Sequence, residues 1–515
     1  MERQEWILIL DFGSQYTQLI ARRIREAGVL SRIHAPDRVN DSVLDDSSLK
    51  GIVLSGGPAS VFAVGAPSLP DWFPRWRGPV LGICYGMHLL ARAEGGEVEG
   101  GDAREYGPAR LEVDEVSPLF DGVSASTDVW MSHGDRVVRP PAGYRIAART
   151  ADVRCAALAD PGRGRYALQF HPEVVHTPEG PAMIRNFLLR VCDCRGDRTP
   201  DRVAEREIER ARERIGPEGE VLCAVSGGVD STVMARLLHR AIGERLHAVF
   251  VDNGLLRLGE REEVLRNFRE LLRIDVDLID GASLFLRRLE GVADPEEKRR
   301  IIGRTFIDLF QEWAERWKGV RFLAQGTLYP DVIESTSTAG PSATIKTHHN
   351  VGGLPETLHL ELIEPFRELF KDEVRAIGRA IGVPEEMVAR HPFPGPGLAV
   401  RILGAVTPRD LELLRRCDDI FIRALRESGE YDRVWQALAV LLPVETVGVM
   451  GDGRTYERVV ALRAVTSVDG MTADWARLPH DFLSRVSTRI LNGVPGVNRV
   501  VYDVSSKPPA TIEWE

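Results

Sequence analysis

The sequence predicts an α/β protein, with two doubly wound parallel-sheet domains followed by a smaller α+β domain. Short apolar segments such as 6–10 and 221–225 are typical of strands that are buried on both faces, as in parallel sheets. Segments with helical periodicity alternate with these strands, which is the pattern of βαβ units. A chain of 515 residues is long enough for about three domains of ordinary size.

The composition excludes several classes of protein. With 43% hydrophobic and 28% charged residues, the chain has the make-up of an ordinary globular protein. A formal net charge of -10 argues against general binding to nucleic acid or anionic membranes, so any phosphate site must be local. Six cysteines in so long a chain do not make a disulfide framework, and no apolar run is long enough to span a bilayer. We therefore expect a cytoplasmic protein that binds neither nucleic acid nor membrane.

The first predicted domain, residues 1–192, contains apolar strands that end in polar motifs, and ligands gather at the carboxyl ends of such strands. The strand at 80–83 runs directly into Gly82-Ile83-Cys84-Tyr85-Gly86, which has the spacing of a nucleophile elbow with a thiol as the nucleophile. The N-terminus of the helix that follows favours a thiolate. Taken alone, the same pattern also fits a small cysteine buried behind a strand.

A second strand end supplies a base for this thiol. The segment 167–170 is expected to be a strand, and it delivers His171-Pro172-Glu173. A thiol, an imidazole and a carboxylate that come from different strand ends are the components of a catalytic triad. His133 lies in Ser132-His133-Gly134-Asp135, which we expect to be a loop, and we interpret it as a substrate-wall or structural residue.

Over residues 1–192 the chain resembles the class I glutamine amidotransferases. The resemblance implies that Cys84 is the nucleophile, His171 the base and Glu173 the residue that orients the base. It also implies an oxyanion hole made by the backbone N–H groups of Gly57 and Tyr85. The expected reaction is attack on the side-chain amide of glutamine, release of ammonia and hydrolysis of a γ-glutamyl thioester.

Three features mark the edge of this domain or depart from the family pattern. His88 stands where many class I amidotransferases carry Gln. Cys192-Asp193-Cys194 has no second pair to complete a metal site, so we interpret the two thiols as incidental. Thr199-Pro200-Asp201 then begins a charged helix, with a capping residue and a proline at the first position. This helix is the expected linker into the second domain.

The second predicted domain, residues 193–391, is organised around a strand, a tight loop and a helix. The loop is Ser226-Gly227-Gly228-Val229-Asp230-Ser231-Thr232. Such a turn directs backbone N–H groups and the positive end of the helix at one point, which suits an anion. The chain has no Gly-Lys-Ser/Thr here, so the loop is not of the Walker type. An ordinary glycine turn is the alternative interpretation.

This loop resembles the one in the N-type ATP pyrophosphatases. The resemblance implies that the loop grips the β,γ-pyrophosphate of ATP, with Mg2+ on the phosphates, and that cleavage at the α-phosphate leaves an adenylylated substrate. Lys346, in a polar segment that we interpret as a mobile lid, and Lys371, at a helix start, are candidate cations for the phosphates. Simple surface charge is the alternative for both lysines.

The third predicted domain, residues 392–515, begins within a segment dense in proline and glycine, 390–397. Strand-like runs such as 459–462 alternate with helices, which predicts a small α+β domain. The last residues carry a Pro-Pro pair, Ile512 and Trp514, so we expect the tail to be tied down rather than frayed.

The two catalytic halves, the 390–397 segment, the 451–456 segment and the 507–515 tail resemble, over essentially the whole chain, a family of glutamine-hydrolysing enzymes that aminate XMP to GMP. This resemblance implies glutamine, ATP and XMP as substrates, AMP and pyrophosphate as products, and a homodimer formed through the C-terminal domain. By position it implies XMP contacts for four residues: Arg299, Asp452, Lys507 and Glu513. Charge pattern alone would place Arg299 on a solvent-facing helix surface.

Two other functions remain open at this point. Another glutamine-dependent adenylylating ligase would share both catalytic halves but not this C-terminal domain. A nucleotide-sensing binding protein would keep the folds without turnover, although it would have no need of the triad.

Overall fold

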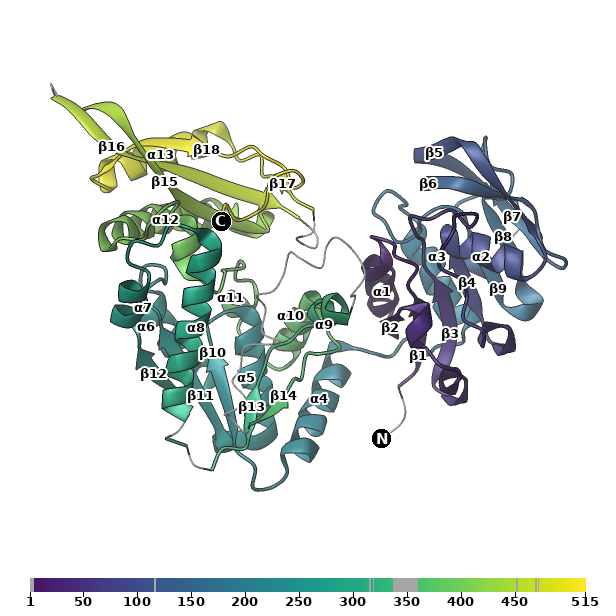
Figure 1. Cartoon of the computed structure of the whole chain (residues 1–515), viewed down its shortest axis with the longest axis horizontal. Helices are drawn as coiled ribbons and strands as arrows, with labels where there is room; N and C mark the ends of the chain where they lie inside the picture. Colours follow the sequence, from purple (N-terminus) through teal and green to yellow (C-terminus); the bar gives the residue numbers. More distant parts are fainter. Residues whose placement is uncertain are drawn as a thin grey trace. The chain divides into compact units, whose positions relative to one another are not determined.

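The computed structural model describes residues 4–114, 117–314, 316–317, 319–336, 360–450, 453–467, 470 and 472–515. The chain forms two compact units, Met1–Thr199 and Pro200–Glu515, and each combines helices with β-sheet (Figure 1). The predicted α/β fold class is confirmed. None of the helices in the described part of the chain combines the length and hydrophobicity that a membrane span requires.

The sheet of the first unit joins a parallel half to an antiparallel half. In the described residues its strand order is β2-β1-β3-β4-β9-β8-β7-β5-β6. The neighbours in the first half of this order, β2-β1-β3-β4-β9, pair in parallel, as predicted. The neighbours in the second half, β9-β8-β7-β5-β6, pair antiparallel. The strands are β1 (Trp6–Leu10), β2 (Leu30–His34), β3 (Leu49–Leu54), β4 (Val80–Ile83), β5 (Glu97–Val113), β6 (Ser126–Arg139), β7 (Arg145–Arg149), β8 (Ala157–Asp160) and β9 (Arg165–Leu168).

Helices α1 (Thr17–Glu26) and α3 (Gly180–Asn186) of this unit pack against each other, and α2 (Tyr85–Ala93) packs on β4 and its neighbours. Every residue of β1 is buried, because the strand lies inside the sheet and its apolar side chains are covered on both faces. The parallel strands therefore form a rigid layer whose carboxyl ends carry the motifs identified in the sequence.

The segment 132–135 lies in β6, so the prediction of a loop there was wrong. Residues along β6 alternate between buried and more exposed positions, and both His133 and Asp135 point inward. Inward polar side chains conceal the alternation of hydrophobic residues that would have predicted a strand. The ring of His133 lies 3.1 Å from a carboxylate oxygen of Glu105 on the neighbouring strand.

The second unit is built on a five-stranded parallel sheet in the order β12-β11-β10-β13-β14. After β10 the chain adds β11 and β12 on one side of that strand, and it later adds β13 and β14 on the other side. The topological switch point therefore lies between β10 and β13. The strands are β10 (Val221–Val225), β11 (Leu246–Asp252), β12 (Val276–Asp280), β13 (Phe322–Ala324) and β14 (Glu361–Ile363). The helices that precede the C-terminal part of this unit are α4 (Pro200–Ile215), α5 (Val229–Ile242), α6 (Glu260–Asn267), α7 (Ala282–Arg288), α8 (Pro295–Ala314), α9 (Tyr329–Thr336), α10 (Lys371–Ala380) and α11 (Glu385–Val388).

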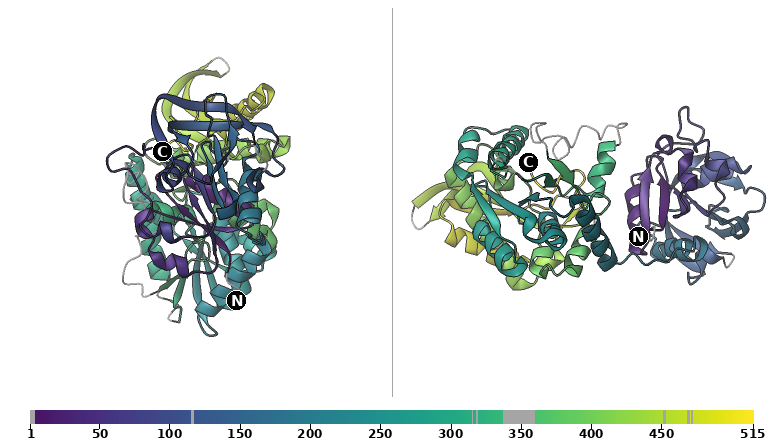
Figure 2. Two further views of the ribbon diagram at one scale, coloured as in Figure 1. Left: turned by 90° about the vertical axis from the view of Figure 1, so that its right-hand side faces the viewer. Right: turned by 90° about the horizontal axis from the view of Figure 1, so that it is seen from below.

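The C-terminal part of this unit contains a mostly antiparallel sheet covered by two helices (Figure 1 and Figure 2). β15 pairs antiparallel with β16, and β18 joins β16 in parallel. The elements are α12 (Pro408–Ser428), β15 (Gln436–Met450), β16 (Gly453–Thr466), β17 (Asp474–Trp475), α13 (His480–Gly493) and β18 (Val497–Tyr502). Leu255 and Ile302 share one hydrophobic core with Phe421 and Val460, so residues on both sides of the predicted boundary at 391 pack together.

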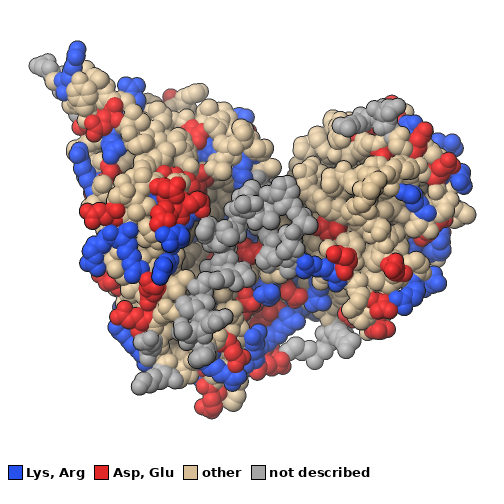
Figure 3. Space-filling view, in the orientation of Figure 1, with Lys and Arg blue, Asp and Glu red and all other residues tan. Residues whose placement is uncertain are grey.

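Charged residues of both signs are interspersed on the face shown in Figure 3. On that face no single charge sign dominates a broad area.

Candidate active sites

Cys84 occupies a strained turn between β4 and α2. It is the residue before the first helical turn, with φ 51° and ψ -107°, a positive φ that non-glycine residues rarely adopt. The flanking glycines make this turn possible. A Cβ on Gly82 would lie 2.7 Å from the carbonyl oxygen of Gly86, and a Cβ on Gly86 would collide with the backbone of Leu54. The local geometry is therefore that of the nucleophile elbow predicted from the spacing.

His171 and Glu173 lie just beyond the end of β9 and form a buried pair. Nδ1 of His171 donates to Oε1 of Glu173 at 2.7 Å, and the two residues are 3% and 0% exposed. The main chain of His171 is held on both sides, by Trp130 O at 3.0 Å and by the hydroxyl of Thr177 at 2.7 Å. The imidazole is thus fixed in orientation, and it interacts electrostatically with the side chain of Cys84, whose Sγ donates to Ser132 O at 3.4 Å.

The environment of His171 keeps a proton on its ring. Burial on its own would lower the pKa of His171, but the Glu173 carboxylate and the interaction with Cys84 hold that pKa well above its usual value. An imidazolium beside sulfur stabilises a thiolate, the reactive form of a cysteine. The structure therefore brings together the three residues that the sequence pointed to.

The loop after β3 approaches the elbow closely. Ser55 orders this loop, because its Oγ accepts from Phe12 N at 3.0 Å and donates to Gly56 O at 2.8 Å. A Cβ on Gly57 would lie 2.8 Å from Phe12 O and 3.4 Å from the ring of Tyr85. Within the described residues, the backbone N–H groups of Gly57 and Tyr85 donate no hydrogen bond. Both are available to an oxyanion formed above Cys84.

His88, the departure from the family pattern, is paired inside the protein. Its Nε2 lies 2.9 Å from Oε1 of Gln169, and its backbone N–H donates to Cys84 O at 3.2 Å. Burial lowers the pKa of His88 to about 4, so the neutral ring donates its proton to the amide oxygen. Because Gln169 lies two residues before His171, this contact ties the nucleophile helix to the strand that delivers the base.

The second predicted site is the loop between β10 and α5, at the switch point of the parallel sheet. The loop closes on itself through its serines. Ser226 N donates to Ser231 Oγ at 3.1 Å, Gly228 N donates to Ser226 Oγ at 3.3 Å, and Ser231 Oγ donates to Gly228 O at 3.1 Å. Gly227 has φ +72°, a conformation that glycine adopts without strain. The result is a compact turn at a helix N-terminus, a geometry that suits an anion.

The remaining residues of this loop begin α5. Val229 is buried, and Thr232 is 1% exposed. Among the described residues, Oγ1 of Thr232 and Oδ1 of Asp230 are buried and have no hydrogen-bond partner. An unpaired buried oxygen is costly, so both atoms are suited to a bound group.

Two cations of α10 face the carboxylate of Asp230. Nζ of Lys371 lies 3.4 Å from its Oδ2, and Arg375, one helical turn further on, interacts with the same charge. Burial lowers the pKa of Arg375. Sequence reasoning missed Arg375, although its i,i+4 spacing from Lys371 was a usable signal. Lys346, with the lid expected around it, lies outside the described residues.

Asp230 has the properties of a Mg2+ ligand. Its Oδ1 is a hard oxygen donor with no partner in the described residues, next to the turn expected to hold phosphates. No group of three or more His, Cys, Asp or Glu residues in the described part of the chain is arranged to hold a metal ion. One carboxylate oxygen beside a turn suited to phosphates fits an ion that takes most of its ligands from phosphate and water, as Mg2+ commonly does.

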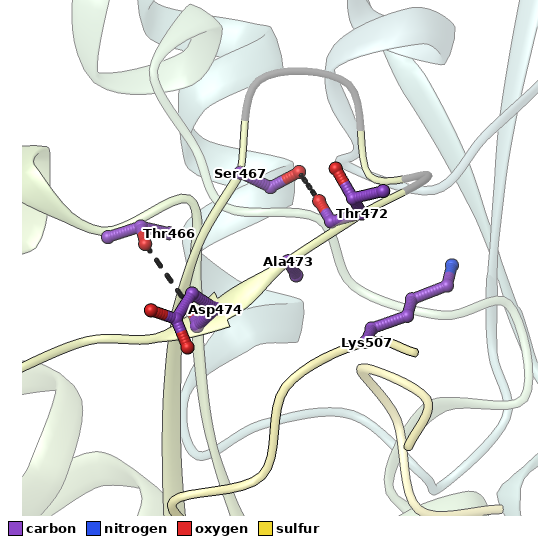
Figure 4. Close-up of a pocket in the computed structure, with 6 residues that line it drawn as sticks. All are labelled: Thr466, Ser467, Thr472, Ala473, Asp474 and Lys507. Carbon is purple, nitrogen blue, oxygen red and sulfur yellow. Dashed lines mark hydrogen bonds between the residues drawn. The ribbon is translucent and has the colours of Figure 1, made fainter. Parts of the chain in front are cut away.

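Lys507 lies at the edge of a pocket of about 450 Å³ in the C-terminal part of the second unit (Figure 4). Its Nζ donates to Gly470 O at 2.8 Å, and its backbone exchanges two hydrogen bonds with Ala473, of 2.7 and 3.1 Å. Hydroxyls, one ammonium group and one carboxylate face this pocket, which is lined by Thr466, Ser467, Thr472, Ala473, Asp474 and Lys507. Asp452 lies outside the described residues.

Glu513 does not line that pocket. Its carboxylate accepts two hydrogen bonds, of 3.1 and 2.8 Å, from Arg401, which is 0% exposed. It also accepts one from the side-chain amide of Gln436. The contacts make Glu513 the counter-ion of a buried arginine, and they fulfil the expectation that the tail is tied down.

Arg299 is also engaged by the end of the chain. It donates to the backbone oxygen of Glu515, and the neighbouring Lys298, fully buried, donates to the Glu515 carboxylate at 2.5 Å. Sequence reasoning missed Lys298, which carries no signal beyond its place in a charged helix. Arg299, Lys507 and Glu513 therefore sit in three separate sets of contacts in this structure.

Comparison with known proteins agrees with this arrangement. Residues 8–191 match the family described as glutamine amidotransferase class-I, and residues 423–514 match the GMP synthase C-terminal domain. Fold and site together define a class I glutamine amidotransferase joined to a second α/β unit. The chain is 56% identical over 517 residues to a glutamine-hydrolysing GMP synthase of Oleidesulfovibrio alaskensis, covering 100% of both chains. The chain belongs to the family of glutamine-hydrolysing GMP synthases.

Other similar proteins carry related names. A glutamine-hydrolysing GMP synthase of Aquifex aeolicus is 56% identical over 510 residues, which is 99% of each chain. Among solved structures, one from Thermoplasma acidophilum that is described as a GMP synthase component is 30% identical, with a TM-score of 0.34. That structure covers 41% of this chain and is itself matched over 100% of its length.

Proposed function

We propose that this chain is a ligase that makes GMP from XMP, with glutamine as the nitrogen donor and ATP as the activating substrate. Family membership supports the overall reaction, which is a step of purine nucleotide biosynthesis. The single observation that carries the glutamine half is the buried His171–Glu173 pair, whose imidazole interacts with the Cys84 side chain. The second half rests on the anion-binding turn at 226–232 and the cations beside it.

In the glutamine half, the Cys84 thiolate attacks the side-chain carbonyl carbon of glutamine. The negative oxygen that forms is stabilised by the N–H groups of Gly57 and Tyr85. His171 gives its proton to the departing nitrogen, which leaves as ammonia, and a γ-glutamyl thioester remains. His171 then takes a proton from water, the resulting hydroxide cleaves the thioester, and glutamate leaves. Glu173 keeps the imidazole in one orientation through both transfers.

In the ATP half, the turn at 226–232 holds the β,γ-pyrophosphate while a purine oxygen of XMP attacks the α-phosphorus. Pyrophosphate leaves, and the oxygen becomes part of an AMP ester. Lys371 and Arg375 offset the phosphate charge, and Mg2+ held by Asp230 would add further charge neutralisation when bound. Ammonia then displaces AMP to give GMP. A purine carbonyl oxygen is a poor leaving group, which is why activation by ATP is needed.

We assign XMP to the pocket beside Lys507. A nucleoside monophosphate offers a phosphate for the ammonium group and hydroxyls for the polar lining. Arg299 and Glu513 hold the tail through Glu515 and Arg401, so they reach XMP only by exchanging those partners. Asp452 stays a proposed XMP contact on the basis of family resemblance.

We further propose that two copies of the chain pair through the β15–β16 hairpin. Apolar side chains on and near this hairpin are exposed, including Val447 at 52%, Val449 at 76% and Tyr456 at 63%. Exposed apolar side chains that cluster on one element are typical of an interface. A symmetric pair of copies would cover the patch in both. Sedimentation of the chain and of a Val447→Glu, Val449→Glu variant tests this, since the variant should be monomeric.

The reaction belongs in the cytoplasm, a compartment that suits the six cysteines, all of which are free and buried thiols. Generating ammonia inside the protein also fits neutral conditions, where free ammonia is mostly protonated.

The deciding experiment supplies the purified chain with ATP, Mg2+ and glutamine and follows pyrophosphate release with different acceptors. XMP should support release of pyrophosphate and formation of GMP and AMP in equal amounts. Turnover with another acceptor but not with XMP would instead identify a different glutamine-dependent adenylylating ligase. Binding of nucleotides without any turnover would identify a sensor.

A further inference from the structure

Arg390 reaches the anion-binding turn from a distant part of the sequence. Its Nη1 donates to the carbonyl oxygen of Gly227 at 2.9 Å, and its Nη2 pairs with the carboxylate of Glu260 at the start of α6. The side chains of Arg390 and Glu260 are 15% and 2% exposed. The guanidinium is therefore a largely buried bridge between two elements at the carboxyl edge of the parallel sheet.

The contact with Gly227 decides which way a neighbouring N–H group points. In a trans peptide, the C=O of one residue and the N–H of the next point in opposite directions. Because the Gly227 carbonyl is turned toward Arg390, the N–H of Gly228 is turned away from Arg390, and it meets Ser226 Oγ at 3.3 Å. Glycine has no side chain to restrict rotation of this peptide, so an outside contact must hold it.

Arg390 is itself held from several sides. Oε2 of Glu260 accepts from the backbone N–H of Arg257 at 2.8 Å, which fixes the carboxylate that grips Arg390. Arg375 of α10 donates to the backbone oxygen of Arg390 at 3.2 Å. The next residue, His391, stacks on Tyr431 with ring centroids 3.7 Å apart and an interplanar angle of 6°. The guanidinium is thus preorganised rather than free to search for partners.

We propose that Arg390 is a positioning residue for ATP: it holds the Gly227–Gly228 peptide so that the Gly227 carbonyl oxygen points toward Arg390 and away from the bound pyrophosphate. The inference rests on the proposed function of the 226–232 turn as the ATP site. Only arginine presents donors in a planar fork that serves a carbonyl and a carboxylate together, so lysine is a poor substitute. In the absence of this contact, the peptide can turn its carbonyl oxygen toward the phosphates and repel them.

The test uses the full-length chain with XMP and ammonium salt at saturation and titrates ATP. Arg390→Met should raise the KM for ATP by about tenfold, because the Gly227 carbonyl oxygen is then no longer held away from the phosphates. The KM for ATP of Arg390→Lys should lie between the values for Arg390→Met and for the unaltered chain. Glutamine hydrolysis at Cys84 should be unchanged in both variants.

Two further variants separate positioning from folding. Removing Arg390 takes the salt-bridge partner from the buried Glu260 carboxylate, so Glu260→Gln is combined with Arg390→Met to restore stability. Arg245→Met is the matched control, because Arg245 also donates to two carbonyl oxygens, Gly216 at 2.9 Å and Gly219 at 2.6 Å, but ahead of β10 rather than after it. The double variant should keep the raised KM for ATP, and Arg245→Met should leave it unchanged.

An ATP KM within twofold of the unaltered chain in the double variant would overturn the inference. An equal rise in Arg245→Met would overturn it as well, because the effect would then be general to the unit. If the proposed function itself were wrong, the unaltered chain would release no pyrophosphate with XMP, or Asp230→Ala would react at the normal rate. Those outcomes are distinct from a failure of the Arg390 inference alone.

Discussion

The imidazole of His88 on α2 lies 2.9 Å from the side-chain amide oxygen of Gln169, two residues before His171. This hydrogen bond links the helix that begins at the nucleophile with the strand end that carries its base. The residue that departs from the family pattern thus has a partner within the same unit. Because its ring is neutral, His88 contributes a hydrogen bond next to the site but no charge.

His88 should make the first unit sensitive to acid. Its pKa is about 4 in the folded protein and about 6.5 when unfolded, so the unfolded state binds the extra proton between these values. Stability is therefore lost as pH falls from 6.5 toward 4, by about 3 kcal/mol in total, and is unaffected above pH 6.5. Calorimetry of the full chain and of His88→Gln, which keeps an amide partner for Gln169 but cannot titrate, should show a smaller acid loss in the variant. Parallel pH dependence in both proteins would contradict this.

Cys84→Ala should abolish GMP formation from glutamine but leave formation from ammonium salt intact, because the thiolate serves only to release ammonia. Both rates are measured at saturating ATP and XMP. Cys155→Ala, a change at another buried thiol of the same unit, is the control and should keep both activities. Equal loss of the two activities in Cys84→Ala would mean that the residue is structural.

Glu173→Gln should lower glutamine hydrolysis by about 10²–10⁴-fold, as expected when the group that orients a catalytic imidazole is neutralised. The pKa of His171 is held high by the Glu173 carboxylate, so the variant should lose the ring proton at lower pH. The alkaline limb of kcat/KM for glutamine, where the imidazolium deprotonates, should consequently move toward acid. A pH profile of the residual activity measures this shift, and an unmoved limb would refute the assigned role.

Asp230→Ala and Ser231→Ala should each strongly lower the rate of GMP formation with either nitrogen source, because ammonia from both sources reacts with the same activated XMP. Asp230 carries the free buried oxygen that suits Mg2+, and Ser231 closes the turn through Ser226. Asp275→Ala removes an exposed carboxylate of the same unit and should be harmless. Normal rates from ammonia in the two loop variants would exclude the turn as the ATP site.

Lys507→Ala should weaken XMP binding by roughly ten- to a hundredfold, the cost of one charge-assisted contact. Titration with XMP at saturating ATP and ammonia measures the effect. Arg489→Ala, at an exposed ion pair with Glu427, should not change the XMP dependence. If Lys507→Ala requires no more XMP than the unaltered chain, the ammonium group of Lys507 does not bind XMP and serves only to hold the Gly470 carbonyl.

Removing the whole tail is a less direct test of XMP binding, for a structural reason. Arg401 and Lys298 are fully buried and take their counter-ions from Glu513 and Glu515. Truncation after residue 506 would remove the carboxylate partner of Lys298 and leave Arg401 with Asp418, 3.7 Å away, and breaking one buried pair costs about 3–5 kcal/mol. We expect the truncated chain to lose thermal stability as well as XMP binding, whereas Lys507→Ala should affect binding alone.

The sequence by itself determined the parts of this protein that depend on short stretches of chain. Apolar runs predicted the buried strands β1, β4 and β10, and the polar residues directly after the strands predicted Cys84 and the 226–232 turn. These features could be read because a strand, its turn and the following helix are set by neighbouring residues.

Only the tertiary structure decided which distant residues meet. It placed His133 in β6, joined His88 to Gln169, and brought Arg390 to the carbonyl of Gly227. It also paired the Glu513 carboxylate with the buried Arg401 guanidinium. Contacts of this kind join residues far apart along the chain and leave no periodicity in the sequence, because they arise only when separately formed elements pack and their buried polar groups must find partners.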